Sequence, residues 1–474
     1  MKKGLSMPQT AHRSSFGRAL TGVISAGAVA AAALAVTVFP ATAEEGIFVP
    51  LFTYRQGPFA NSGTPLANGM RDYLTMLNER DGGIGGVKLI IEECETEYDP
   101  DKGVACYDAV RTRNPVMINP WSTPTTVKII PRVAKDQIPI LSMAHGLSAS
   151  AKGDVFPWVF NPPATYWDGL SMILNHISTE VGGLRRLKGI RFGYIYLESG
   201  FGREVIPLFE QLSKDLGFEL KLYAVPTSQL EQQAGLWQQV MKDQRDFMIM
   251  FGYGAMNPIA IKAAAAVGYP MAKFFSIWYP SDGDLRSVGV AATGFKTLNW
   301  HNVGPNYPLI QDVLKYVVTK NKSRVKSPSE VGELIYNHGI YNSMLIAEAI
   351  RTAQRITGKK VVNGADVRRG LENLDITAQR LKEIGLDGFT EPIRITCRDH
   401  NGHRPTYIQQ WHGAEWLKIS GQIQPMKSRL EPLIDAAAKE FIAKNSPWPT
   451  RQETCDQPSV SGSIDKPATQ SAKE

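Results

Sequence analysis

The chain contains a complete strand–helix–strand unit at residues 191–225, which read RFGYIYLESGFGREVIPLFEQLSKDLGFELKLYAV. Residues 191–197 and 218–225 are short apolar runs typical of buried strands, and residues 203–216 carry apolar side chains at helical spacing. Two strands joined by a helix pair in parallel, because the crossover returns the chain to the same end of the sheet. The unit therefore predicts a parallel sheet covered by helices.

The same alternation of apolar and amphipathic stretches extends on both sides of this unit. Downstream, the expected strands are residues 246–251 and 274–278, and the expected helices are residues 236–243 and 257–267. Upstream, the expected strands are residues 47–49, 88–94, 115–119 and 138–144, and the expected helices are residues 63–79, 101–112 and 125–136. Two separate runs of alternation predict an α/β protein with two doubly wound parallel-sheet lobes.

The chain after residue 299 has a different pattern and is mainly helical. The expected helices are residues 308–321, 330–354, 364–374 and 429–444. The expected strands are residues 392–396 and 406–411.

The positive charge of the chain is concentrated at its N-terminus. The 474 residues carry a formal net charge of +7, with 43% hydrophobic and 20% charged residues, as is usual for a globular protein. Residues 1–43 contain no Asp or Glu and four cations, Lys2, Lys3, Arg13 and Arg18, which leaves only +3 on the remaining chain. A nearly neutral chain of this length does not point to nucleic acid as a partner.

The first 43 residues have the pattern of a secretory signal peptide. The cations precede an apolar run at residues 19–39, and Ala41-Thr42-Ala43 then presents the small-x-small pattern that a signal peptidase cleaves. The alternative is an uncleaved membrane anchor, because about 20 apolar residues can span a bilayer. The Ala-rich run and the position of the cleavage pattern favour removal of residues 1–43 and export to the periplasm.

Four cysteines suit an exported chain, because an even number in an oxidising compartment favours disulfides. Cys94 and Cys106 are close in sequence and flank an acidic turn, so they form the first expected pair. Cys397 and Cys455 then remain as the second pair, although the sequence alone leaves the connectivity open. The second pair would anchor residues 451–474, which are poor in apolar groups and expected to be disordered.

Signatures of catalysis are largely missing from the chain. It has no Gly-x-Ser-x-Gly elbow, Walker A loop or complete Gly-x-Gly-x-x-Gly fingerprint. An exported hydrolase is a remote alternative, because Ser122 with His145 is the only pairing of a nucleophile with a base, and no acid is placed to orient the histidine. We therefore expect a protein without catalytic residues.

One group of residues resembles a metal site. Cys397, His400 and His403 are spaced like zinc ligands, but Cys397 is needed for a disulfide and residues 399–402 fit a β-turn. Neither a metal nor another cofactor is expected.

Polar and aromatic side chains follow the expected strands, where parallel sheets bind their ligands. Residues 119–125, 142–146 and 251–254 occupy such positions. A purely structural role for Ser122 and Thr123 is helix capping, which does not exclude contact with a ligand. Aromatic groups at strand ends are typical of a ligand cleft, and four occur here: Trp121, Tyr253, Trp278 and Tyr279.

Several short segments, taken in order, resemble the periplasmic solute-binding proteins of ABC transporters, specifically the leucine/isoleucine/valine-binding type with the class I bilobed fold. The resemblance covers roughly residues 46–420. No single segment is specific, but their order and spacing together are. The segments are Gly57-Pro58 with the stretch to Asp72-Tyr73, LNERDGGIGG at residues 77–86, Tyr98-Asp99-Pro100, Ser199-Gly200-Phe201-Gly202 and AAAVGYP at residues 264–270.

The resemblance implies two lobes joined by three hinge strands that close over a small ligand. The hinge crossings are expected near residues 160–164, 297–301 and 390–396. The N-terminal lobe then comprises residues 44–162 and 298–392, and the C-terminal lobe comprises residues 163–297 and 393–450.

The resemblance also implies where the ligand binds. Ser122 and Thr123 would meet the anionic end of the ligand, and Ala144, His145 and Gly146 would supply the neighbouring loop. The complete set of expected ligand-binding residues is Ser62, Trp121, Ser122, Thr123, Ala144, His145, Gly146, Phe201, Tyr253 and Trp278.

Two departures from the family pattern bear on the ligand. Amino-acid binders place an acidic residue near the end of the strand that here reaches Trp278, and its role is to hold the ligand's ammonium group. The nearest acids are Asp282 and Asp284. Ser62 also stands where the family has an aromatic residue. The ligand is therefore either a branched-chain amino acid or an aromatic or otherwise uncharged organic solute.

The resemblance implies transport without chemistry. A solute that contacts both lobes favours the closed form, and the expected monomer then delivers it to a membrane permease driven by ATPase subunits. The main alternative is a periplasmic sensor of the same fold, which would pass a ligand signal to a partner.

Overall fold

The computed structural model describes residues 46–402, 404–449, 451 and 453–455, so the expected signal peptide at residues 1–43 lies outside the described residues. The described chain forms a seven-stranded sheet and three two-stranded sheets, with helices around them. No helix in these described ranges is long and apolar enough to cross a membrane.

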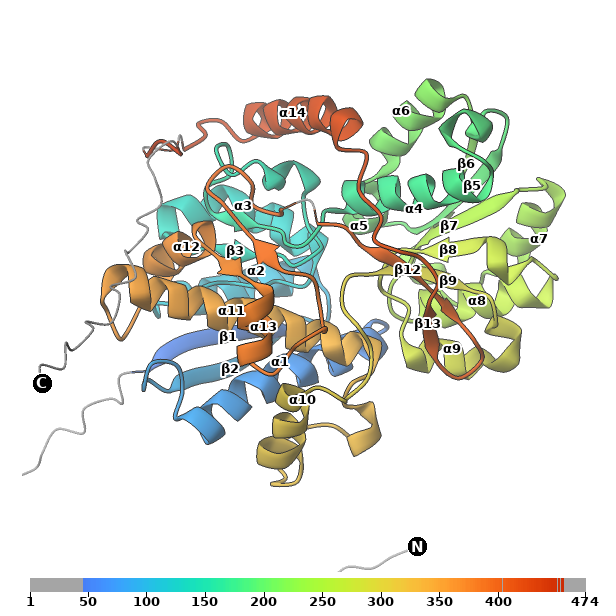
Figure 1. Ribbon diagram of the computed structural model, residues 1–474. Coiled ribbons are helices and arrows are strands. Elements are labelled where there is room, and N and C mark those ends of the chain that lie inside the picture. Colours follow the sequence, from blue (N-terminus) through green and yellow to red (C-terminus); the bar gives the residue numbers. More distant parts are fainter. Residues whose placement is uncertain (1–45, 403, 450, 452, 456–474) are drawn as a thin grey trace, which may run out of the picture. The chain divides into compact units, whose positions relative to one another are not determined.

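The first lobe contains short parallel strands (Figure 1). Strand β1 pairs with β2, and β3 pairs with β4; their bounds are Ile47–Thr53, Leu89–Glu95, Ile140–Leu141 and Val159–Phe160. Both faces of β1 are covered, since all seven of its residues are buried. This is the arrangement that alternation of strands and helices predicts.

The strand expected at residues 115–119 is reduced to a link between the two pairs. Val116 N donates to Phe48 O at 3.1 Å, and Ile118 forms a parallel bridge with Ile140. Pro115 and Pro120 flank this link and lack the N–H groups that a longer ladder needs. The resulting order is β2, β1, residues 116–118, β3 and β4, with β1 beside the point where the order reverses.

The helices of the first lobe come from both halves of the chain. They are α1 (Ala60–Asp81), α2 (Pro100–Val110), α3 (Thr123–Asp136), α10 (Pro308–Val313), α11 (Leu334–Thr357), α12 (Gly364–Glu372) and α13 (Ala378–Glu383). Helices α1 and α11 lie side by side (Figure 1). A Cβ atom on Gly69 would lie 2.1 Å from Tyr336 O, and one on Gly339 would lie 2.3 Å from Leu66 O. Glycine therefore allows these two backbones to touch.

Two expected helices of this region differ in the structure. Helix α11 begins at Leu334 rather than at residue 330, after a short 3-10 turn at Pro328–Glu330. The helix expected at residues 308–321 is α10 followed by a π-helical turn, Leu314–Val318. A two-stranded antiparallel sheet of β10 (Asp375–Ile376) and β11 (Ile393–Arg394) follows α12.

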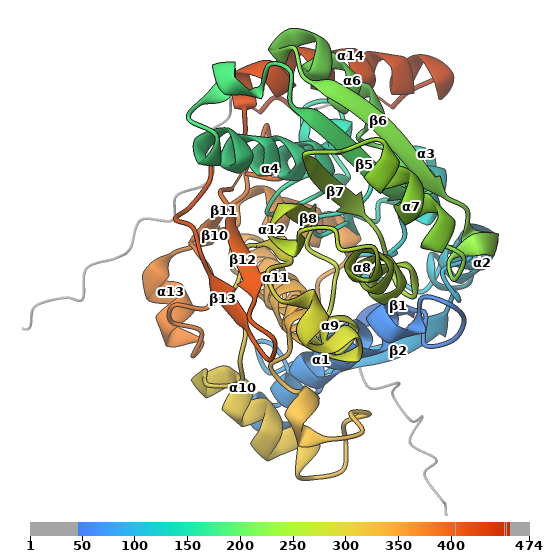
Figure 2. The same ribbon diagram turned by 90° about the vertical axis from the view of Figure 1, so that its right-hand side faces the viewer.

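The second lobe contains a seven-stranded sheet in the order β13-β12-β9-β8-β7-β5-β6, and Figure 2 shows several of these strands side by side. Strands β5 to β9 are parallel, and β12 is antiparallel to β9 and β13. The bounds are β5 (Arg191–Leu197), β6 (Glu219–Val225), β7 (Phe247–Phe251), β8 (Phe274–Ser276), β9 (Lys296–Asn299), β12 (Tyr407–Trp411) and β13 (Trp416–Lys418).

The helices of the second lobe are α4 (Tyr166–Glu180), α5 (Gly200–Arg203), α6 (Ile206–Leu216), α7 (Ala234–Lys242), α8 (Met256–Ala266) and α9 (Asp282–Val288). The strand order reverses between β5 and β7, which places a second switch point at the carboxyl ends of these strands. The expected class of fold, two doubly wound lobes, is confirmed.

Three chain segments connect the lobes and lie side by side. The first follows β4, the second follows β9 and the third lies between β11 and β12. Asn302 N donates to Phe389 O at 2.7 Å, which joins the second segment to the chain before β11. Arg404 N donates to Pro163 O at 2.9 Å, which joins the first segment to the third. These hydrogen bonds hold the connections together as one hinge region.

Both expected disulfides are present. Cys94–Cys106 joins β2 to α2, with a Cα–Cα distance of 5.9 Å, and Cys397–Cys455 joins the segment directly after β11 to the C-terminal segment, with a Cα–Cα distance of 5.5 Å. Cys397 is therefore no metal ligand. Among the residues that the structure places, no group of three or more His, Cys, Asp or Glu side chains could hold a metal ion, and His403 lies outside them.

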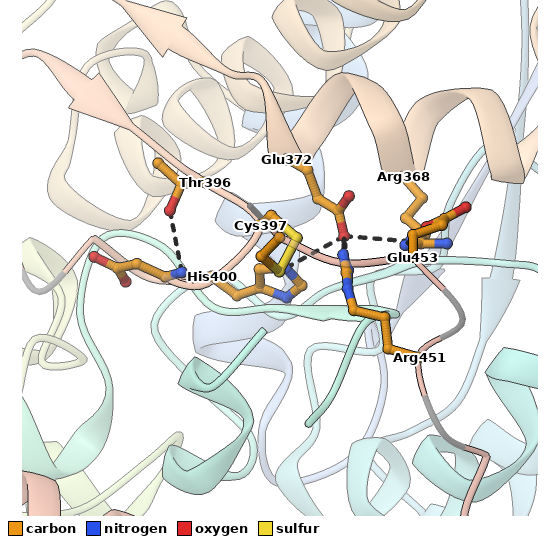
Figure 3. The surroundings of a disulfide bond; sticks show 9 residues. Arg368, Glu372, Thr396, Cys397, His400, Arg451 and Glu453 are labelled. Atoms are coloured by element: carbon orange, nitrogen blue, oxygen red, sulfur yellow. Dashed lines mark hydrogen bonds and ion pairs between the residues drawn. A yellow bond between two sulfur atoms is a disulfide. The ribbon is translucent and has the colours of Figure 1, made fainter. Parts of the chain in front are cut away.

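The C-terminal segment packs against both lobes. Helix α14 (Lys427–Lys444) follows Met426, whose N donates to Ser171 Oγ of α4, and Ala438 packs in the core of the first lobe. Figure 3 shows the end of this segment: Arg451 pairs with Glu372 of α12, and Arg368 Nη2 lies 2.5 Å from Glu453. Of the tail expected to be disordered, residues 451 and 453–455 are thus held in place, and residues 456–474 lie outside the described residues.

Candidate ligand-binding site

A cavity lies where the carboxyl ends of the two sheets face each other. It contains about 230 Å³ of space not filled by atoms, part of it open to solvent, and is lined by Tyr98, Trp121, Thr123, His145, Tyr166, Phe201, Tyr253 and Tyr279. Six of these eight residues are Tyr, Trp or Phe, and none is Asp, Glu, Lys or Arg. A cleft with aromatic walls and a few polar atoms is the usual form of a small-molecule site.

The wall from the first lobe is built on Trp121 and His145. Their rings stack with a centroid distance of 5.3 Å and an interplanar angle of 21°. The indole Nε1 of Trp121 donates to Met70 Sδ at 2.9 Å, which fixes the ring. Trp121 and Ala144 both have left-handed backbones, with φ of 50° and 52°. Non-glycine residues adopt this conformation at a cost, and such strain is concentrated at functional sites.

His145 is buried and uncharged at neutral pH. It follows β3, is 2% exposed, and its backbone N donates to Asn161 Oδ1 at 3.1 Å. Burial lowers the pKa of the imidazole to about 4, although a hydrogen bond to Met143 O opposes the shift. Nδ1 lies 3.1 Å from Met143 O, whereas Nε2 is buried without a hydrogen-bond partner among the described residues.

The wall from the second lobe comes from three strand ends and one helix. Phe201 lies in α5 after β5, Tyr253 follows β7, Tyr279 follows β8, and Tyr166 is the first residue of α4. Their rings touch, with centroid distances of 5.1 Å for Tyr166–Phe201 and 4.8 Å for Tyr253–Tyr279. Ser199 caps α5 by accepting from Phe201 N, which sets the position of the Phe201 ring at the cavity.

Hydrogen bonds join the two lobes around the cavity. Tyr166 OH lies 3.2 Å from Thr123 Oγ1, and Tyr279 OH donates to Ala144 O at 3.3 Å. The hydroxyl of Tyr253 also bonds that of Tyr54, which directly follows β1. The lobes are therefore in direct contact, and the cavity lies between them.

The two acids nearest to Trp278 in sequence have other roles. Asp284 caps α9 and accepts from Asn61 Nδ2 of α1 at 2.9 Å, and burial raises its pKa to about 6. Asp282 accepts from Leu334 N at 2.8 Å. Neither lines the cavity, so the lining has no carboxylate to pair with an ammonium group.

Half of the expected site residues line the cavity: Trp121, Thr123, His145, Phe201 and Tyr253. Ala144 and Gly146 contribute only backbone atoms, as Ala144 O accepts from Tyr279 and Gly146 N donates to Thr123 Oγ1 at 3.3 Å. Ser122 Oγ caps α3 by accepting from Thr125 N. Ser62 is buried in α1, and Trp278 lies behind the wall, stacked on Tyr166 at 6.1 Å.

Three lining residues are additional to the expected set. Tyr279 is one of the strand-end aromatics, and it rather than Trp278 lines the cavity because side chains alternate between the two sides of an extended chain. Tyr98 lies in the Tyr98-Asp99-Pro100 turn, next to the N-cap of α2. Tyr166 is placed by a capping box of Thr165 and Asp168, a sequence signal that marks the start of α4 but not its contacts.

A second hollow lies beside the connecting segments, away from the expected site residues. It contains about 620 Å³ of unfilled space, much of it open to solvent, and Trp300, Phe389 and Tyr407 contribute to its lining. Charged side chains, including Asp387 and Lys418, also line it. The aromatic cavity fits the position and character expected of the ligand site better.

Comparison with known families supports the same interpretation. The model of the family described as periplasmic binding protein matches residues 46–415. The chain belongs to the periplasmic binding protein family. No curated protein matches the chain.

Several solved structures resemble the chain along most of its length. A protein from the Pseudomonas fluorescens group, described as an ABC transporter permease, has 33% identity and a TM-score of 0.78, and the match covers 87% of this chain and 100% of that one. A branched chain amino acid ABC transporter from Thermus thermophilus with bound valine has 17% identity and a TM-score of 0.69, covering 82% and 99%. A solute binding protein from R. palustris in complex with benzoate has 15% identity and a TM-score of 0.62, covering 80% and 97%.

Membership in the periplasmic binding protein family establishes the general role. The chain is a substrate-binding component of an ABC transporter, a class that binds small solutes and works with membrane permease components in the periplasm. It is a solute-binding protein and not an enzyme, as the missing catalytic signatures predict.

Proposed function

We propose that the aromatic cavity captures a small aromatic or otherwise uncharged organic solute. The protein, as a monomer whose signal peptide has been removed, delivers this solute to a membrane permease driven by ATPase subunits. The observation that carries the proposal is the lining, which combines six aromatic side chains with Thr123 and a neutral His145. Aromatic rings of a solute stack favourably on such walls.

The same lining disfavours a free amino acid. An α-amino acid brings both an ammonium and a carboxylate group, and burying either without a charged or strongly hydrogen-bonding partner is unfavourable. Asp282 and Asp284, the acids closest to the strand end, are engaged in capping and interlobe hydrogen bonds. The fold itself is compatible with either kind of solute, as valine and benzoate are bound in two of the solved structures.

Capture follows from the contacts between the lobes. Because Tyr166 and Tyr279 of the second lobe bond to Thr123 and Ala144 of the first, a solute among these residues touches both lobes at once. Such a solute has differential affinity for the closed form and shifts the equilibrium toward it. No bond of the solute is made or broken.

Calorimetric titration of the purified mature protein tests the proposal. The panel is benzamide, phenol, benzoate, leucine and valine. At least one aromatic compound is expected to bind, and small-angle scattering is expected to show that its binding lowers the radius of gyration. The two amino acids are expected to give negligible heats. Tight binding of leucine, or binding of an aromatic compound without closure, contradicts the proposal. Tyr253→Ala removes a wall and is expected to abolish binding, whereas Tyr253→Phe, which keeps the ring and loses only the hydrogen bond to Tyr54, is expected to weaken binding far less.

A further inference from the structure

Three of the five side-chain hydroxyl groups that line the cavity, those of Thr123, Tyr166 and Tyr279, form one directed chain of hydrogen bonds. It begins with Gly146 N, which donates to Thr123 Oγ1 at 3.3 Å. The next links are Thr123 Oγ1 to Tyr166 OH at 3.2 Å, Tyr166 OH to Tyr279 OH at 3.0 Å, and Tyr279 OH to Ala144 O at 3.3 Å. The chain thus starts at a backbone donor and ends at a backbone acceptor.

The last acceptor fixes the direction of every link. A carbonyl oxygen can only accept, so Tyr279 uses its single hydroxyl hydrogen on Ala144 O. Tyr166 must then donate to Tyr279, and Thr123 must donate to Tyr166. Each hydroxyl has one hydrogen, and none of the three has a hydrogen left for a solute. This side of the cavity therefore offers lone pairs rather than donors.

His145 extends the same pattern on the other side. Its Nδ1 faces Met143 O at 3.1 Å, and because the carbonyl only accepts, Nδ1 carries the hydrogen. In the neutral ring Nε2 is then a bare acceptor. It is buried, it has no hydrogen-bond partner among the described residues, and its ring lines the cavity. Stacking on Trp121 holds the ring in this orientation.

We propose that His145 Nε2 accepts a hydrogen bond from an O–H or N–H group of the bound solute, and that the site thereby selects aromatic solutes that carry such a donor over their carboxylate counterparts. This inference rests on the proposed function of the cavity. A neutral phenol, alcohol or primary amide satisfies the acceptor. A carboxylate brings only further lone pairs to a lining that has no cation.

Two series of probes of nearly equal shape isolate the donor. Benzamide, acetophenone and benzoate differ in whether an NH₂, a CH₃ or an O⁻ group stands beside the carbonyl, and phenol and toluene differ in OH against CH₃. Each is titrated calorimetrically into the wild-type protein and into His145→Phe, which keeps an aromatic ring but removes the acceptor.

A solute without a donor leaves the buried acceptor unpaired, and this weakens binding by roughly tenfold or more. The wild-type protein is therefore expected to prefer benzamide to acetophenone and benzoate, and phenol to toluene, by at least about tenfold. In His145→Phe these preferences should collapse.

The outcomes separate the inference from the proposed function. Equal binding of the members of each series, or a preference that persists in His145→Phe, overturns the role of His145 while aromatic capture stands. Failure of benzamide and phenol to bind overturns the inference, and if leucine binds instead the proposed function falls as well. If neither the wild-type protein nor His145→Phe binds any of the five probes, the inference and the proposed function are both overturned.

A measurement on the unmodified protein guards against a folding defect in the variant. With ¹⁵N-labelled histidine, NMR is expected to show a His145 signal with Nδ1 protonated and Nε2 bare at pH 7. Adding phenol should move the Nε2 signal and leave Nδ1 protonated. A proton on Nε2, or an Nε2 signal that phenol does not move, overturns the inference without any mutation.

Discussion

The hydroxyl group of Tyr279, which follows β8 in the second lobe, donates a hydrogen bond to the main-chain carbonyl oxygen of Ala144 in the first lobe at 3.3 Å. Ala144 has the left-handed backbone, with φ of 52°, that turns its carbonyl toward the cavity region. This single link ends the hydroxyl chain and bridges the lobes. The hydrogen bond therefore connects the direction of the hydroxyl chain in the site to the contact between the two lobes.

Removing this hydroxyl should weaken solute binding without removing the aromatic wall. A hydrogen bond of this kind contributes about 0.5–1.5 kcal/mol, so Tyr279→Phe is expected to lower the affinity for benzamide by roughly three- to tenfold. Small-angle scattering should show a smaller ligand-dependent fall in the radius of gyration. Tyr223→Phe is the matched control, because Tyr223 lies on the edge strand β6 and its OH donates to Asp243 at the end of α7, outside the cavity lining. Equal losses in the two variants would contradict a role for the Tyr279 link in closure.

A buried carboxyl group at another contact between the lobes predicts a pH effect. Ser148 N of the first lobe donates to Glu204 Oε1 of the second at 2.8 Å. Burial raises the pKa of Glu204 from 4.5 to about 7, and the nearby Asp168 adds to the shift. A raised carboxyl pKa favours the folded state fully below pH 4.5, and this contribution is lost as the pH rises through about 7.

The wild-type protein should therefore lose stability relative to Glu204→Gln between pH 5 and pH 8, by roughly 2 kcal/mol. Urea denaturation at several pH values measures both proteins, and their difference isolates Glu204 from the buried histidines. The buried histidines act in the opposite sense, because burial lowers the pKa of His145 to about 4 and that of His301 to about 3. A difference between the two proteins that does not change with pH would contradict the prediction.

Periodicity in the sequence was sufficient for the fold, since strands β5, β7 and β8 are buried apolar runs and β6 is a partly buried edge strand, all separated by helices. Periodicity did not predict the lengths of strands in which proline interrupts the backbone hydrogen bonds to the neighbouring strand. Residues 115–119 and 138–144 have the composition of strands, but Pro115, Pro120 and Pro139 leave only a bridge and the two-residue β3. Strand composition is a property of side chains, whereas pairing requires backbone N–H groups.

The candidate site was half predictable for a related reason. Trp121, His145, Phe201 and Tyr253 stand directly after strands or at a helix start, so topology alone brings them to the cleft. Tyr98 and Tyr166 reach the cavity through a turn and a helix cap, whose side-chain directions no periodicity encodes. Trp278 and Tyr279 are adjacent, and a shift of one residue decides which of them faces the cavity.

Reduction of the two disulfides should have unequal effects. Cys397–Cys455 closes a loop with a sequence separation of 58 residues, and Cys94–Cys106 closes one of 12. In the chain-entropy model these are worth about 4 and about 3 kcal/mol, because the longer loop restricts the unfolded chain more. The double variant Cys397→Ser/Cys455→Ser should therefore unfold in less urea than Cys94→Ser/Cys106→Ser. The reverse order would show that the ion pairs of Arg451 and Arg368 hold the C-terminal segment without help from the disulfide.

The close approach of α1 and α11 makes the strongest prediction about stability. At Gly69 an added Cβ atom would lie 2.1 Å from Tyr336 O, which is backbone and cannot move aside as a side chain can. Gly69→Ala should therefore destabilise the protein by about 1–3 kcal/mol, as overpacking does in other cores. Gly235→Ala is the matched control: Gly235 is an exposed residue of α7 with nothing within 4 Å of the added atom, and there alanine should stabilise by up to about 1 kcal/mol. Urea denaturation measures the free energy of unfolding of each variant and shows whether it falls or rises relative to the wild-type protein. A neutral Gly69→Ala variant would mean that the two helices can separate, and the discontinuous first lobe would then be less tightly joined than its backbone contacts indicate.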